Sequence, residues 1–426
     1  MAVGSLAKLA LSSDPAVAAQ ATRTIFAEIV EPWSDRFEPA DCDRYLDFMA
    51  ECLLAGGSPV ADKLRRLGFE SPAKLAARGR GLSQARPLQC PSREVRKVLV
   101  LSRVTLGADI AVTSVVIEAA KRAFPQAGVE FVGGAKGAAF FAGSARVRHL
   151  PISYSRGASF ADRMQVWLEV YRVIEESISG LEADEYVILD PDSRLTQLGI
   201  LPAGGSDANY RFFESRSFGG TAGETIGRIT ARWCGAVLPG IDPDDLNPQV
   251  ELSSEDIERG LKLRQVLAKP IAAVSLGVGG RESKRLSGAF EDELLETLRR
   301  AGYAIVLDYG AGDAEKLRVD ERVERFKGTA ADSSGAPAQL VTWQGSLAAF
   351  GGLIAACECY VGYDSASSHL AAALGVPVVE VFAGAASERM RQRWTPTGSA
   401  NVQLIAVESE TPGAAVLAAV AKAIAK

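Results

Sequence analysis

Residues 361–384, VGYDSASSHLAAALGVPVVEVFAG, constrain the fold of this chain more than any other stretch. β-forming residues lead into a short polar loop, and residues 369–374 then suit a helix of about two turns. Gly375 favours the end of that helix, and Pro377 prevents its continuation. The apolar run 378–382 is typical of a buried strand. The stretch therefore predicts strand, loop, short helix and strand, which is the arrangement of an α/β protein.

The polar loop of this stretch is a candidate anion site. Four of its residues carry side-chain oxygens that suit helix capping: Asp364, Ser365, Ser367 and Ser368. The helix N-terminus that follows would present unpaired backbone N–H groups and the positive end of the helix dipole. Small residues there let a phosphate approach closely. The alternative is an ordinary strand-to-helix turn without a ligand.

The same residues carry a resemblance to a known family. The pattern D-S-x-x-x-H-L-A-A-A-L-G-V-P-V-V-x-V-F resembles the donor-site signature of the heptosyltransferase-like glycosyltransferases (ADP-heptose:lipopolysaccharide heptosyltransferases, glycosyltransferase family 9). The matching positions are Asp364, Ser365, His369, Ala371, Ala372, Ala373, Gly375 and Pro377. Ala366 stands where the family usually has glycine, and Phe382-Ala383-Gly384 stands in place of Phe-Gly. The resemblance implies an α/β chain with the GT-B fold, in which two Rossmann-like doubly wound domains face a cleft.

Length and element pattern divide the chain into three parts. A chain of 426 residues is too long for one ordinary core. We expect a helical extension and linker in residues 1–92, a Rossmann-like acceptor domain in 93–250, and a Rossmann-like nucleotide-sugar donor domain in 251–426. The all-helical extension lies outside the resemblance. It either covers one face of the next domain, which we favour, or serves docking or self-association.

Proline- and glycine-containing segments mark the expected ends of the helices in the extension. We expect its first helix to end at Glu31-Pro32-Trp33 and its last to end at Ala77, before a linker rich in Gly, Arg, Pro and Ser. The predicted helices span residues 14–30, 39–54, 59–67 and 72–77.

The acceptor domain begins with strand 95–101, a polar loop, helix 110–124 and strand 129–132. This stretch is similar to the family's strand followed by S-L-G-D, in which the Asp is the proposed general base. The resemblance places that role on Asp109, with Ala108 as one additional residue. The alternative is that Asp109 caps the following helix. Candidate contacts to an anionic acceptor are Arg103, Arg194, Arg211 and Arg216.

The donor domain contains a second candidate anion loop, G-V-G-G-R-E-S-K-R-L, after strand 270–276. It resembles the family loop that approaches the donor phosphates, and Lys284 is the expected pyrophosphate contact. We expect His369 to tie its loop by a hydrogen bond rather than to act as an acid. The predicted donor-binding residues are Gly279, Ser283, Lys284, Asp364, Ser365, Ser367, Ser368, His369, Ser387 and Glu388.

Charge and cysteine content narrow the remaining choices. A net charge of −5 argues against a general nucleic-acid binder. Six scattered cysteines suggest no disulfide framework, so the cytoplasm is the simplest compartment. Cys357 and Cys359 are better explained as buried thiols than as metal ligands, because the chain has only two histidines. The turn Asp190-Pro191-Asp192 is interpreted as a strand-end turn rather than a metal-binding D-x-D.

The implied activity is transfer of a heptose-like sugar from a nucleotide diphosphate to an acceptor hydroxyl, with inversion and without a metal. No cofactor is expected beyond the nucleotide-sugar co-substrate, for which ADP is favoured. The acceptor is a glycan, a lipopolysaccharide core or a protein, and peripheral association with a membrane stays open. One alternative is a catalytically silent nucleotide-sugar-binding or interaction protein with the same fold. Another is an epimerase or hydrolase that uses the same cleft.

Overall fold

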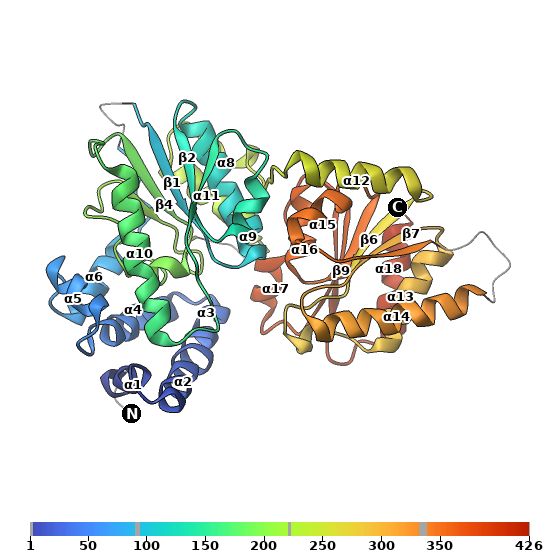
Figure 1. Cartoon of the computed structure of the whole chain (residues 1–426), viewed down its shortest axis with the longest axis horizontal. Coiled ribbons are helices and arrows are strands. Elements are labelled where there is room, and N and C mark those ends of the chain that lie inside the picture. The colour runs from blue at the N-terminus through green and yellow to red at the C-terminus, as the bar shows by residue number, and fades with distance from the viewer. Residues whose placement is uncertain (1–2, 90–93, 220–222, 332–338, 426) are drawn as a thin grey trace. The chain divides into compact units, whose positions relative to one another are not determined.

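The computed structural model describes residues 3–89, 94–219, 223–331 and 339–425. The chain forms two compact units (Figure 1). The first unit is Met1–Ala138 with Ala145–Leu246, and the second is Ala139–Ser144 with Asn247–Lys426. Each unit contains one parallel sheet between helices, and an N-terminal helical region is present, so the predicted fold class is confirmed. The predicted boundary after residue 92 falls outside the described residues.

The first sheet has the order β3-β2-β1-β4-β5, and all of its pairs are parallel. Its strands are β1 Lys97–Leu101, β2 Gly128–Gly133, β3 Val147–Pro151, β4 Tyr186–Asp190 and β5 Tyr210–Phe212. The chain builds outward from β1 through β2 and β3, then returns to place β4 on the other side of β1. Ligands of such sheets bind where the strand order reverses, at the carboxyl ends of the strands. That point lies between the ends of β1 and β4.

Helices cover both faces of this sheet. In chain order they are α7 Leu106–Ala108, the π-helix η2 Asp109–Thr113, α8 Ser114–Ala123, α9 Ala135–Ala138, α10 Phe160–Ile178, the 3₁₀ turn η4 Arg194–Thr196, α11 Ile226–Val237 and the 3₁₀ turn η5 Pro243–Asp245. The 3₁₀ turn η3 Ala139–Phe141 belongs to the second unit. Helix α8 packs against α11, whereas α10 packs against the N-terminal extension.

The extension forms one hydrophobic core with the first sheet. Its helices are α1 Val3–Ala10, α2 Pro15–Arg23, the π-helix η1 Thr24–Val30, α3 Glu31–Arg36, α4 Pro39–Leu54, α5 Pro59–Arg66 and α6 Pro72–Leu82. Met49 of α4 and Leu64 of α5 are fully buried in the same cluster as Trp167 of α10 and Leu99 of β1. The extension therefore covers one face of the sheet, which is the interpretation favoured from the sequence (blue helices in Figure 1).

Two expected helix ends in the extension are wrong. The chain stays helical through Pro32 to Arg36, because the π-helix η1 precedes the proline and the amide N–H of Glu31 bonds to Phe26 O, five residues back. The wider turn accommodates a residue that an α-helix interior would exclude. The last helix continues to Leu82 instead of Ala77. Gly79 lies inside it because a Cβ there would lie 2.6 Å from Leu46 Cδ2, so this glycine permits close packing of α6 on α4.

The second sheet has the order β11-β10-β9-β6-β7-β8, again with parallel pairs. Its strands are β6 Ile271–Ser275, β7 Ala304–Asp308, β8 Leu340–Trp343, β9 Cys359–Tyr363, β10 Val378–Ala383 and β11 Val402–Val407. Its helices are α12 Ser254–Val266, the 3₁₀ turn η6 Glu282–Lys284, α13 Gly288–Arg300, α14 Asp313–Ala331, α15 Leu347–Ile354, α16 Ala366–Ala373, α17 Glu388–Trp394 and α18 Gly413–Ile424. The strand order reverses between β6 and β9.

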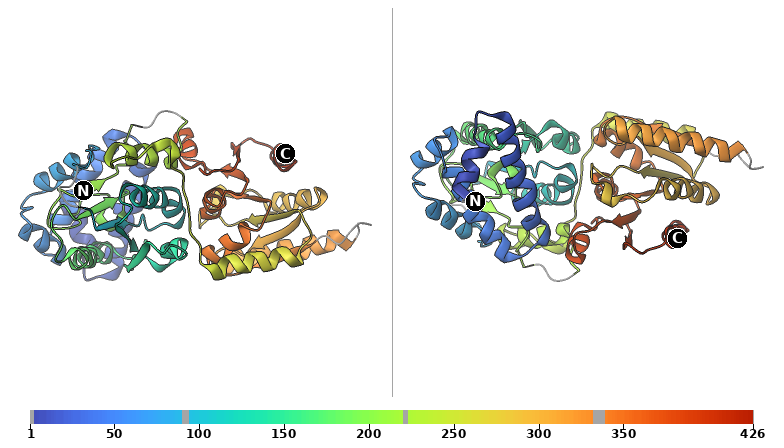
Figure 2. Two further views of the ribbon diagram at one scale, coloured as in Figure 1. Left: turned by 90° about the horizontal axis from the view of Figure 1, so that it is seen from above. Right: turned by 90° about the horizontal axis from the view of Figure 1, so that it is seen from below.

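Helices of the second unit form two layers (Figure 2). Side chains of α13, α14 and α18 share a core with one face of the sheet, whereas α12, α15 and α16 pack on one another. None of the helices in the described part of the chain has the length and apolar character needed to cross a bilayer.

Candidate active site

Three loops meet at the carboxyl edge of the second sheet. The stretch singled out from the sequence forms β9, a polar loop, α16 and β10, as predicted. Ser365 is the N-cap of α16, and it forms a capping box with Ser368. The loop after β10 packs closely against η6, because a Cβ on Gly384 would lie only 2.3 Å from Ser283 O. Residues 279–284, 364–368 and 384 therefore surround the point where the strand order reverses.

Lys284 and Asp364 join two of these loops. Lys284 Nζ forms an ion pair with Asp364 Oδ2 and lies 3.5 Å from the Asp364 backbone oxygen. The side chains are 15% and 7% exposed, so the pair is largely shielded from water. The cation that the sequence assigned to a diphosphate thus lies beside the N-terminus of α16, with a carboxylate as its partner.

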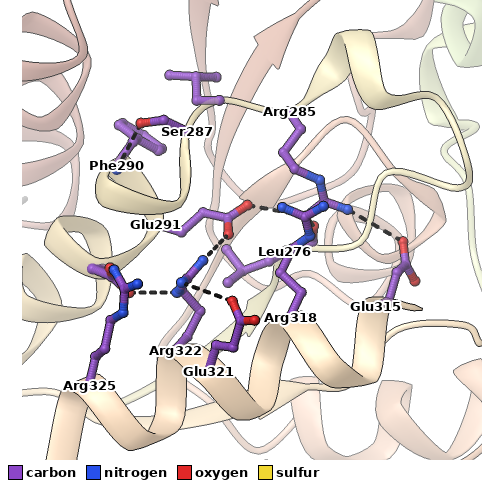
Figure 3. A network of polar contacts seen from close by, with 12 residues as sticks. Leu276, Arg285, Ser287, Phe290, Glu291, Glu315, Arg318, Glu321, Arg322 and Arg325 are labelled. Atoms are coloured by element: carbon purple, nitrogen blue, oxygen red, sulfur yellow. Dashed lines mark hydrogen bonds and ion pairs between the residues drawn. The ribbon is translucent and has the colours of Figure 1, made fainter. Parts of the chain in front are cut away.

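The neighbouring arginine, Arg285, holds the loop in place through the network drawn in Figure 3. Its Nη1 lies 3.1 Å from Glu291 Oε1, and Arg322 Nη1 lies 3.6 Å from the other oxygen of this buried carboxylate. Arg285 Nη2 lies 3.8 Å from Glu315 of α14, and Glu315 also accepts the Val278 N–H at 3.2 Å. The Arg285 side chain is therefore occupied by carboxylates within the fold. Lys284, by contrast, lies at the N-terminus of α16.

Glu380 is a buried carboxyl group that the sequence analysis missed. It lies on β10, is fully buried, and its Oε1 is 2.6 Å from Ser368 Oγ. Its Oε2 has no hydrogen-bond partner among the described residues. Burial, followed by the nearby Asp364, raises the pKa of Glu380 well above its ordinary value. The signal for it was a single acidic residue inside the apolar run 378–382.

His369 does not make the expected tie through its Nδ1. That atom is buried and has no hydrogen-bond partner within the described residues. The ring instead packs edge-on against Trp394, with centroids 5.9 Å apart. Burial lowers the pKa of His369 to about 4, so the ring is neutral at pH 7.

The remaining predicted donor residues differ in what they can still bind. Gly279 has a φ of +60°, which favours glycine, and has open space where a Cβ would be. Ser367 is buried in the first turn of α16. Ser387 caps α17 by accepting the Met390 N–H at 3.1 Å, and Glu388 pairs with Arg391 on the surface.

In the first unit, Asp109 is buried at the start of η2. It accepts hydrogen bonds from Ser102 Oγ at 2.8 Å, from the Arg103 N–H at 2.7 Å and from Thr113 Oγ1 at 2.8 Å. The structure does not show the helix cap considered as the alternative, because the carboxylate binds the preceding loop and the next helical turn. Burial raises the pKa of Asp109 to about 6, against the opposing effect of these three hydrogen bonds.

The additional residue Ala108 coincides with a π-helical turn. Asp109–Thr113 is the π-helix, and regular α-helix resumes at Ser114. A π-turn is the form in which a helix absorbs one extra residue, and such turns are frequent at functional sites. Just before it, Val104 has a φ of +61°, which is an outlier for a β-branched residue.

Asp192, after β4, gathers two of the predicted arginines. Its carboxylate lies 3.2 Å from Arg103 Nη2 and 3.1 Å from Arg216 Nη2, and it accepts the Ser215 hydroxyl. Burial acts to lower the pKa of Arg216, but Asp192 and Glu214 raise it above the ordinary value. Because the Arg103 N–H also binds Asp109, the candidate base and these arginines form one connected group.

The other two arginines are placed differently. Burial and the positive charges of Arg216 and Arg194 lower the pKa of Arg103. Arg194 Nη2 lies 3.5 Å from Ser34 Oγ of the extension. Arg211 instead donates to backbone carbonyls, those of Ala208 at 2.8 Å and Pro87 at 3.3 Å. The structure therefore brings Arg103, Arg194 and Arg216 together but not Arg211.

In the Asp-Pro-Asp turn, both carboxylates accept hydrogen bonds from groups of the protein itself. Asp190 accepts the Ser193 N–H at 2.7 Å, the Tyr210 hydroxyl at 2.6 Å and the Thr196 hydroxyl. Across the described residues, no three His, Cys, Asp or Glu side chains are grouped so that they could hold a metal ion.

Comparison with known proteins agrees with this geometry. Residues 232–416 match the model of glycosyltransferase family 9 (heptosyltransferase). A glycosyl transferase family 9 structure from Veillonella parvula is 14% identical, with a TM-score of 0.54 over 75% of this chain and 88% of that one. The Escherichia coli ADP-heptose lps heptosyltransferase II is 17% identical, with a TM-score of 0.52 over 77% and 98%. At these identities the two structures show the fold. No curated protein matches the sequence.

The family match spans the second sheet and the three loops at its carboxyl edge. It confirms the resemblance drawn from residues 361–384. Residues 232–416 are thereby identified as a glycosyltransferase family 9 (heptosyltransferase) domain.

Proposed function

We propose that the protein transfers a heptose-like sugar from a nucleotide diphosphate to an acceptor hydroxyl, by inversion and without a metal. The observation that carries the proposal is the Lys284–Asp364 pair at the N-terminus of α16. We assign donor binding to residues 251–426 and acceptor binding to residues 93–250.

In the donor site, the diphosphate takes the place of Asp364 as a partner of Lys284. The N–H groups of the first turn of α16 then bind phosphate oxygens, where the helix dipole favours negative charge. These donors stabilise the charge that develops on the leaving diphosphate, which is the usual work of preorganised electrostatic groups. Since Lys284 and the helix can supply positive charge, the step needs no divalent cation. We take the nucleotide to be ADP, as in the name of the E. coli relative.

In the acceptor site, Asp109 removes the proton from the attacking hydroxyl. A pKa of about 6 leaves this carboxylate ionised at pH 7 but a better proton acceptor than a free Asp. One base suffices for inversion, because a single displacement needs only one deprotonated nucleophile. The π-turn supports this assignment, since it absorbs the additional Ala108 and lets regular helix resume five residues beyond Asp109, at Ser114.

Arg103, Arg194 and Arg216 favour an acceptor that carries negative charge near its hydroxyl. Planar guanidinium groups suit carboxylate and phosphate, which glycans and lipopolysaccharide cores provide. Arg211 is left out, because its donors bind backbone carbonyls.

The test is a transfer assay in a chelator with ADP-, UDP- and GDP-linked sugars and anionic glycan acceptors, with NMR of the product anomer. Transfer with inverted configuration in the chelator is expected. A retained configuration, or activity only with added metal, would overturn the proposed chemistry. Donor binding without consumption would instead favour the silent binding protein.

A further inference from the structure

Glu380 occupies an unusual place in the second sheet. Its neighbours along β10, Val379 and Val381, belong to the core shared with α18. Because side chains alternate along a strand, Glu380 lies on the opposite face, where its carboxyl group meets Ser368 of α16. A fully buried acidic side chain thus lies directly beneath α16, the helix whose N-terminus we assign to the donor site.

Counting hydrogens at Ser368 indicates the state of this carboxyl group. Ser368 Oγ lies 2.8 Å from the backbone oxygen of Ser365, 3.4 Å from the Ser365 N–H and 2.6 Å from Glu380 Oε1. A serine hydroxyl donates one hydrogen bond and accepts two. The Ser365 oxygen and an ionised Glu380 can both only accept, and the Ser368 hydroxyl has one hydrogen for the two of them. A hydrogen on Glu380 satisfies both contacts at once.

The charges around Glu380 favour the same state. The groups that face it are Asp364 on the loop after β9, Lys284 on η6, Tyr360 on β9 and Ser368 on α16. His369 is neutral, and its environment is set by the same Asp364 and Lys284. An ionised Glu380 would be a second anion beside one cation, with Oε2 left without a donor in the described part of the chain. If Glu380 is neutral, the positive charge of Lys284 and the negative charge of Asp364 compensate each other.

We propose that Glu380 is an uncharged carboxylic acid that donates a hydrogen bond to Ser368 and keeps the phosphate-binding end of α16 free of surplus negative charge. It acts as a positioning residue, since it acts through Ser368 and the capping box. The effect of Glu380 on donor binding rests on the proposed function. The protonation state of Glu380 does not depend on it. Ionisation of Glu380 both breaks the bond to Ser368 and places an anion near the incoming diphosphate, so donor affinity falls as pH rises through its pKa.

The first test is infrared difference spectroscopy of the full chain, wild type against Glu380→Gln, at pH 7. The glutamine amide can donate to Ser368 Oγ in the same place, so the fold is retained. We expect the wild type to show one protonated-carboxyl stretch that the variant lacks. If the difference spectrum shows only a carboxylate, the inference is overturned. This outcome does not depend on whether any nucleotide binds.

The second test is calorimetric titration of ADP from pH 5 to pH 10 with the wild type, Glu380→Gln and Ser368→Ala. Where Glu380 ionises, we expect the wild-type Kd to rise by up to about tenfold per pH unit relative to Glu380→Gln, as one-proton linkage requires. Ser368→Ala should bind more weakly at every pH. Parallel pH profiles for wild type and Glu380→Gln would contradict the link to the donor. Absence of ADP binding in all three at every pH would contradict both this link and the donor site.

Discussion

Removal of the Lys284 charge should weaken donor binding strongly in a protein that still folds. A hydrogen bond to a charged group contributes about 1.5–3 kcal/mol, so Lys284→Ala should raise the Kd for ADP by about 10- to 150-fold. The upper part of this range is expected, because the substitution also leaves Asp364 as an uncompensated carboxylate beside the phosphates. Stability should fall by no more than about 3 kcal/mol, since the Lys284 side chain keeps some exposure to water.

The assay is calorimetric titration of ADP combined with thermal melting. Lys262→Ala, on the exposed surface of α12, is the matched control and should bind as the wild type does. The informative variant is Lys284→Ala with Asp364→Asn, which removes the isolated carboxylate. We expect it to recover stability but not affinity. If affinity returns as well, repulsion by Asp364 explains the single variant and Lys284 makes no contact with the donor, which refutes the reasoning.

Three further variants test other parts of the account. Asp109→Asn should abolish transfer while the Kd for ADP is unchanged, and in the wild type kcat/KM should fall as pH decreases through about 6, where Asp109 becomes protonated; appreciable turnover of the variant would remove Asp109 as the base. Arg285→Ala should lower the melting temperature strongly, at a cost of about 3–5 kcal/mol, because it leaves the buried Glu291 with a weakened counter-charge; an unchanged melting curve would show that the network is dispensable. Gly384→Ala should weaken ADP binding, since its Cβ would meet Ser283 O at 2.3 Å, whereas Gly302→Ala, with positive φ but open space, should lose stability alone; equal binding by both would argue against the contact of these loops.

The glycine and proline that end a helix made the structure of residues 361–384 predictable from the sequence. Gly375 and Pro377 end one helix and force a strand after it, and the structure has α16 and β10 at those positions. The pairing of Lys284 with Asp364 could not be read in this way, because the two residues are 80 positions apart and meet only in the folded sheet. Glu380 was missed for a related reason. An apolar run predicts a buried strand, but the sequence does not say which buried atoms face it.

Edge strands and helix ends were the weakest parts of the sequence reading. β3, β8 and β11 are partly exposed and β5 has three residues, so none of them forms a continuous apolar run. Pro32 and Gly79 normally interrupt helices, yet a π-turn tolerates the first and close packing on Leu46 uses the second. Among the four predicted arginines, the sequence could not separate Arg211, which binds backbone carbonyls, from those at Asp192.

Thermal melting of the purified chain against ADP, UDP and GDP in a chelator shows whether the protein binds a nucleotide and which base it prefers. A ligand at 100 times its Kd stabilises a protein by about 2.7 kcal/mol, which moves the midpoint visibly. The donor site predicts that ADP raises the midpoint of the wild type and has little effect on Lys284→Ala at the same concentration. Folded protein whose midpoint responds to none of the three nucleotides would contradict the account.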